Sequence, residues 1–100
     1  MSMKGKDRAA LRAEAHHLKA LVHVGHAGLT PALFSTLDDV LRTHELVKSQ
    51  VAQAGELSAR DAANQTAERL KAEVVQVIGR TFTLYRENPE LKRGAEPPWR

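Results

Sequence analysis

The sequence contains no cysteine, few aromatic residues and no long apolar run, and each absence excludes a class of protein. Without cysteine there is neither a disulfide framework nor a thiolate metal site. Two phenylalanines, one tyrosine and one tryptophan are too few for a platform that stacks single-stranded bases. No stretch approaches the roughly 18 apolar residues of a membrane-spanning helix, and residues 1–8 lack the apolar core of a secretory signal. We therefore expect a cytoplasmic protein without membrane contact.

The length and composition indicate a single globular domain. The 100 residues are 42% hydrophobic and 27% charged, which is an ordinary balance for a folded domain. Fifteen Lys and Arg against twelve Asp and Glu give a net charge of +3, which agrees with a polyanionic partner without requiring one. No coiled-coil pattern or long apolar edge indicates an obligate oligomer, so we expect a monomer.

Hydrophobic spacing predicts seven elements in the order helix, strand, helix, strand, helix, strand, strand. The helices are expected over residues 7–18, 31–43 and 59–72, with Asp7 as the first N-cap, and the strands over residues 21–24, 45–52, 73–78 and 81–86. This order predicts an α/β (α+β) fold, a two-layer sandwich built on a four-stranded mixed sheet. The domain would span residues 7–86, between a flexible N-terminus at 1–6 and a polar, proline-containing tail at 87–100.

Three local signals predict where elements begin or turn. Thr30 is a good N-cap for the second helix, and Pro31 suits the first helical position because its missing N–H is not needed there. Ser58 followed by Asp61 resembles a capping box for the third helix. Between the last two strands, Gly79-Arg80 fits a two-residue hairpin loop of type II′.

The segment Gly25-His26-Ala27-Gly28 stands between the first strand and the second helix. Its two glycines permit a positive φ and a close approach of another backbone. The first N–H groups of the following helix lack internal partners, and the helix dipole favours negative charge, so the loop is a candidate anion site. The alternative is that both glycines serve only a tight strand-to-helix turn.

Metal and catalytic sites are not expected. Four of the five histidines lie within residues 16–26, but His16 and His17 are adjacent on a helix and point about 100° apart. No cysteine or neighbouring acidic cluster completes a tetrahedral set, so we predict neither metal nor cofactor. No nucleophile with its base and no phosphate-binding P-loop can be assembled, which argues against an enzyme.

Three ordered blocks carry a family resemblance. They are Ala15–Lys19 with Val22 and Gly25–Thr30, then His44–Lys48, then Val77–Arg80 with Leu84–Arg86. Together they resemble the CRM-domain family, of which YhbY is the stand-alone bacterial form, over about residues 8 to 87. The sequence departs from the family pattern at two places. Ala20 stands where family members commonly have proline, and the centre of the loop, His26-Ala27, carries no Lys or Arg.

The resemblance implies a fold similar to the C-terminal domain of the third bacterial translation initiation factor. It also implies a non-enzymatic protein that assists assembly of the large ribosomal subunit by contacting precursor rRNA through the GxxG loop and flanking basic residues. The candidate RNA-binding residues are Gly25, His26, Ala27, Gly28, Lys19, Arg12, Arg80 and Arg86. The alternative is a protein-interaction module that docks on a ribosomal protein or assembly factor, which the low net charge and the acidic pair Asp38-Asp39 favour.

Overall fold

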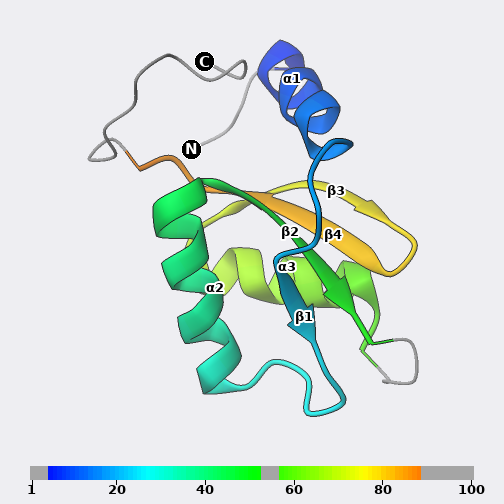
Figure 1. Ribbon diagram of the computed structural model, residues 1–100, viewed down its shortest axis with the longest axis vertical. Coiled ribbons are helices and arrows are strands. Elements are labelled where there is room, and N and C mark those ends of the chain that lie inside the picture. Colours follow the sequence, from blue (N-terminus) through cyan, green and yellow to red (C-terminus); the bar gives the residue numbers. More distant parts are fainter. Residues whose placement is uncertain (1–4, 53–56, 89–100) are drawn as a thin grey trace.

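The computed structural model describes residues 5–52 and 57–88, which form three helices and four strands (Figure 1). The elements are α1 (Gly5–Ala15), β1 (Val22–Val24), α2 (Pro31–His44), β2 (Leu46–Val51), α3 (Ala59–Leu70), β3 (Glu73–Ile78) and β4 (Thr81–Tyr85). The predicted order and the α+β class with a four-stranded mixed sheet are confirmed. Within the described ranges, no helix is both long enough and apolar enough to cross a membrane.

The strands are arranged in the order β1-β2-β4-β3. Strands β1 and β2 are parallel, and α2 makes the crossover between them, while β2–β4 and β4–β3 are antiparallel. His23 pairs with Gln50, and Gln50 pairs with Thr81, so these three side chains share one face of the sheet. The register therefore decides which polar residues are neighbours.

Helices α2 and α3 cover one face of the sheet and enclose the main core. Leu37 and Leu41 of α2 are fully buried against the valines of β1 and β2. Alanines at positions 59, 62 and 63 bring the backbone of α3 close to the strands because their side chains are small. The alternation of Val47, Ser49 and Val51 toward this core agrees with the predicted pattern of the second strand.

Helix α1 packs on the opposite face, at one end of the sheet. Leu11 forms a second buried cluster with Leu46 and Val75, both of which point away from α2 and α3. Arg8 anchors the helix, since its Nη1 donates to the Val74 carbonyl at 2.6 Å. The predicted two layers therefore gain a partial third layer, because two apolar residues on the outer face need cover. None of the helices in the described residues covers the remainder of that face, toward the β3–β4 hairpin (Figure 1).

The predicted caps at Thr30 and Ser58 and the predicted turn at Gly79 are confirmed. Thr30 has an extended backbone, and its Oγ1 accepts from the Leu33 N–H at 3.1 Å, with Pro31 opening the helix. Ser58 Oγ accepts from the Asp61 N–H at 3.0 Å. Gly79 has φ +57°, whereas Arg80 is not among the residues with positive φ, which matches the predicted type II′ turn.

Several predicted boundaries were wrong by a few residues. Helix α1 begins at Gly5, so Asp7 lies in its first turn and is not the N-cap, and it ends at Ala15 in place of residue 18. Lys71 ends α3 with a left-handed φ of +56°. Glu45 was expected in the second strand, but it caps α2 with φ +63° and is fully buried.

The predicted termini lie mostly outside the described residues. Residues 1–4 and 89–100 are not described, and neither is the Ala54-Gly55 break that was expected after the second strand. The contacts of the domain continue at least to Asn88, whose Nδ2 donates to the Arg42 carbonyl at 2.8 Å. Flexibility of residues 1–6 and 87–100 therefore stays a prediction.

Candidate functional site

The GxxG loop leaves the carboxyl end of β1, and its two glycines have different structural roles. Gly28 has φ +73°, and its N–H donates to the Gly25 carbonyl at 3.0 Å, which closes a tight turn. Gly25 has no positive φ, and a Cβ added there would meet no atom within 4 Å. The need for a turn thus explains the glycine at 28, but neither backbone conformation nor packing explains the glycine at 25.

The backbone amides of the loop are only partly available to a ligand. The Gly28 N–H is used within the turn, the Thr30 N–H donates to the Gly28 carbonyl at 3.2 Å, and the Leu33 N–H is capped by Thr30. The expectation of a continuous run of open amides into the helix was therefore wrong. Among the described residues, no partner is present for the N–H groups of His26, Ala27 and Leu29. The candidate anion site consequently lies in the loop more than at the helix end.

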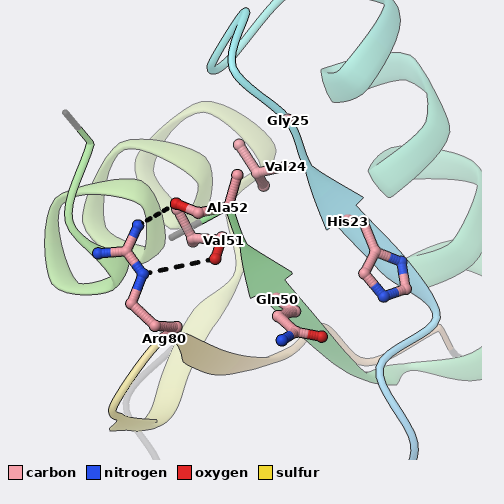
Figure 2. Close-up of a pocket in the computed structure, with 7 residues that line it drawn as sticks. All are labelled: His23, Val24, Gly25, Gln50, Val51, Ala52 and Arg80. Atoms are coloured by element: carbon pink, nitrogen blue, oxygen red, sulfur yellow. Dashed lines mark hydrogen bonds between the residues drawn. The ribbon is translucent and has the colours of Figure 1, made fainter. Parts of the chain in front are cut away.

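Arg80 is the predicted basic residue that the fold brings nearest to the start of this loop, since it lines the same pocket as Gly25. Its Nη2 donates to the carbonyls of Ala52 and Leu57, the latter at 3.3 Å, and its Nε lies 3.5 Å from the Val51 carbonyl (Figure 2). These contacts tie the β3–β4 hairpin to both ends of the β2–α3 connection. None of the described carboxylates pairs with the guanidinium, so its positive charge is held in place without local compensation.

Arg86 has a different environment from the one predicted. Its Nη1 donates to Asp38 Oδ1 at 2.8 Å and to the Leu70 carbonyl at 2.9 Å, and its Nη2 donates to the Asp38 carbonyl at 3.1 Å. The guanidinium therefore joins β4 to α2 and α3, and Asp38 neutralises its charge. Asp38, one of the acidic pair that favoured a docking module, is half-buried in this contact. We leave Arg86 out of the candidate site because Asp38 neutralises its charge and both of its terminal nitrogens already donate within the protein.

Lys19 and Arg12 are exposed, but the fold separates them from the loop. Lys19 lies on the connection that enters β1, whereas the loop leaves the other end of that strand (Figure 1). Lys19 precedes β1 (Val22–Val24) and Gly25 follows it, so the two residues lie at opposite ends of that strand. Arg12 is on α1, over the far end of the sheet. Contact of Lys19 or Arg12 with RNA therefore stays a prediction that does not involve the loop directly.

The open part of the sheet presents polar residues that sequence reasoning missed as site residues. The side chains of His23 and Gln50 are neighbours by register, and Lys48 lies on the same face two positions before Gln50. The signal in the sequence was the alternation of these residues with buried valines. That alternation shows that they point outward, but only the pairing of β1 with β2 shows that they lie side by side.

A pocket of about 300 Å³ joins this face to the loop. It is lined by His23, Val24, Gly25, Gln50, Val51, Ala52 and Arg80 (Figure 2). The described residues contain no candidate metal site. In residues 5–52 and 57–88, no three His, Asp or Glu side chains are placed to hold a metal ion. The loop, the pocket and Arg80 therefore form the candidate site, with chemistry suited to binding an anion or a polar ring.

Comparison with known proteins agrees with this description. Residues 3–86 match the CRS1 / YhbY (CRM) domain. "Probable RNA-binding protein YqeI" of Bacillus subtilis is 33% identical over 91% of this chain and 95% of its own length, and "RNA-binding protein" of Haemophilus influenzae is 34% identical over 91% and 92%. The solution structure of the hypothetical protein SAV1595 from Staphylococcus aureus superposes with a TM-score of 0.76 at 32% identity, covering 91% of this chain and 95% of the other. The chain therefore belongs to the CRS1/YhbY (CRM) domain family.

Proposed function

We propose that this protein binds RNA through the GxxG loop and the adjoining open sheet face. In this proposal it acts in the cytoplasm as a monomer and assists assembly of the large ribosomal subunit by contacting precursor rRNA. One observation carries the proposal: among the described residues the N–H groups at His26, Ala27 and Leu29 have no partner, and they follow Gly25, which lines the same pocket as Arg80, whose charge no described carboxylate neutralises. The names of the related proteins from B. subtilis and H. influenzae support RNA as the polyanion.

The loop would grip the sugar-phosphate backbone. Amide N–H groups donate to phosphate oxygens in charge-assisted hydrogen bonds, which are stronger than neutral ones. The missing side chain at Gly25 leaves the approach open, and Arg80 adds positive charge at one edge. Such contacts position an RNA without reading its sequence, so the preference would be for shape, with binding and not chemistry as the protein's action.

A protein-docking function is the second candidate, and two exposed apolar side chains favour it. Leu21 is 53% exposed and Ile78 is 54% exposed. Ile78 pairs with Thr81 and so shares the open face with Gln50. If this face docked on a ribosomal protein through these residues, affinity would depend on apolar area and change little with salt.

Salt dependence separates the two functions. A protein that neutralises three phosphates should show a log–log slope of about −2.1 to −2.7, which amounts to a loss of about 20- to 40-fold between 50 and 200 mM salt. The measurement is filter binding of a precursor rRNA fragment over that range. The variant Lys48→Gln should lower affinity for many RNA sequences alike and reduce the slope by about one unit, as expected for a lysine that contacts phosphate.

Lys71→Gln is the matched control, because Lys71 is an exposed lysine at the end of α3, the helix that covers the other face. It should leave both affinity and slope unchanged. If the RNA affinity of the wild-type protein does not change with salt, while the protein binds a ribosomal protein, the docking function would replace the RNA proposal.

A further inference from the structure

The pocket beside the GxxG loop opens where the carboxyl ends of β1 and β2 meet the β3–β4 hairpin. Gly25 belongs to both the loop and the pocket wall, so a group held by the loop and a group held in the pocket would be adjacent. We propose that this pocket receives one unstacked nucleobase of the bound RNA. The inference rests on the proposed function and adds to it a position at which the protein reads a base.

The pocket has an apolar floor of the kind that a planar ring needs. Most of the accessible lining is carbon, and because Val24 and Val51 are almost fully buried in the core, it comes mainly from the other lining residues, including half-buried Ala52. A volume of about 300 Å³ lies at the lower end of the range for small-molecule sites, which are mostly apolar with a few polar groups that fix orientation. A single base is a ligand of this size and character.

The rim of the pocket carries groups that recognise a base edge. His23 and Arg80 stand on opposite sides, with Gln50 between them (Figure 2). In the described part of the chain, the Gln50 amide has no hydrogen-bond partner, so it offers both a donor and an acceptor, as a base edge requires. The imidazole ring of His23 offers a flat face for stacking, which partly replaces the aromatic residues that the chain lacks.

Arg80 adds a positive charge that is fixed in position. Its Nε and Nη2 face the carbonyls of residues 51, 52 and 57, and these contacts hold the guanidinium still. Its Nη1 has no partner among the described residues, but in Figure 2 it lies on the side of the guanidinium turned away from Gln50 and His23, so Arg80 offers a base its positive charge and planar edge and not a directed hydrogen bond. An arginine that is already positioned loses little conformational freedom on binding.

The open space at Gly25 connects the two parts of the site. Since a Cβ at this position would contact nothing in the protein, a sugar can pass there from the loop amides to the pocket. A nucleotide whose phosphate lies on the N–H groups of His26 and Ala27 would then place its base between His23 and Arg80. The loop alone would hold any RNA, and the pocket would favour an RNA with a base turned out of its helix.

The test is an NMR titration of the whole protein with each of the four ribonucleoside monophosphates and with ribose 5-phosphate, up to about 10 mM to detect millimolar binding. We expect the nucleotides, but not ribose 5-phosphate, to shift the amide signals of Gln50, Ala52 and Arg80. Gln50→Ala should weaken binding of the preferred nucleotide by at least about fivefold, which is the lower limit of the discrimination that a bidentate contact to a base provides. Gln76→Ala is the matched control, because Gln76 shares the open face without lining the pocket.

Adding an RNA hairpin should displace the nucleotide, because both use the same pocket. Equal shifts with ribose 5-phosphate, no shifts with any nucleotide, or joint binding of nucleotide and hairpin without displacement would each overturn the inference. Filter binding of the same hairpin at low salt is measured in parallel. If the protein binds the hairpin but shows no base-dependent shift, the proposed function would be retained and the pocket would not be a base site. If the protein does not bind the hairpin at all, the result would count against the proposed function itself.

Discussion

Replacing Gly25 by alanine separates the role of the loop in folding from its role in binding. The backbone at Gly25 has no positive φ, and the added Cβ meets no atom within 4 Å. A glycine-to-alanine change at such a position stabilises a protein by about 0.4–1 kcal/mol, because it restricts the unfolded chain. In a domain of this size, each kcal/mol shifts Tm by about 4–8 °C, so Gly25→Ala should raise Tm by roughly 2–8 °C.

Gly28→Ala is the matched control from the same motif. With φ at +73°, any residue carrying a Cβ is placed in the left-handed region, at a cost of about 1–2 kcal/mol. Its Tm should therefore fall by roughly 4–16 °C. The two glycines of one motif are thus expected to shift stability in opposite directions, and thermal unfolding followed by circular dichroism measures both.

The same pair of variants tests the binding site. In Gly25→Ala the new methyl group occupies the open space through which the sugar-phosphate chain approaches, so RNA affinity should fall about tenfold, equivalent to about 1.4 kcal/mol. The assay is filter binding of a precursor rRNA fragment at low salt. A Gly25→Ala protein that folds well and binds RNA as tightly as the wild type would refute this reasoning, and so would a lowered Tm in that variant.

Two further predictions concern stability away from the loop. Arg86→Met should lower the free energy of unfolding by about 2 kcal/mol in a urea titration, because the hydrogen bonds of the charged guanidinium to Asp38 and Leu70 are lost. The RNA affinity of the folded variant should not change, and a marked loss of affinity would return Arg86 to the binding site. Ser58→Ala should cost about 1 kcal/mol in the same measurement, because the Asp61 N–H loses its cap; unchanged stability would show that the cap contributes nothing.

Local signals in the sequence predicted most of the fold because short-range physics decides them. A hydroxyl before a helix caps it whatever the tertiary fold, as at Thr30 and Ser58, and a glycine at position 79 selects the hairpin turn. The alternation of Val47, Ser49 and Val51 likewise showed one buried face. The ends of α1 were less predictable, because a helix end without a strong cap depends on what the helix packs against.

The site itself was only half visible in the sequence. The GxxG loop is contiguous, so the sequence by itself determined its place between a strand and a helix, and three ordered blocks indicated the family. Which arginine is available is not a local property: Arg80 and Arg86 look alike in sequence, yet one borders the pocket and the other is neutralised by Asp38, 48 residues away. The pocket, the neighbours His23 and Gln50, and the face that α1 covers were decided only by tertiary structure. Strand order and register bring distant residues together, and neither is encoded in the spacing of residues along one strand.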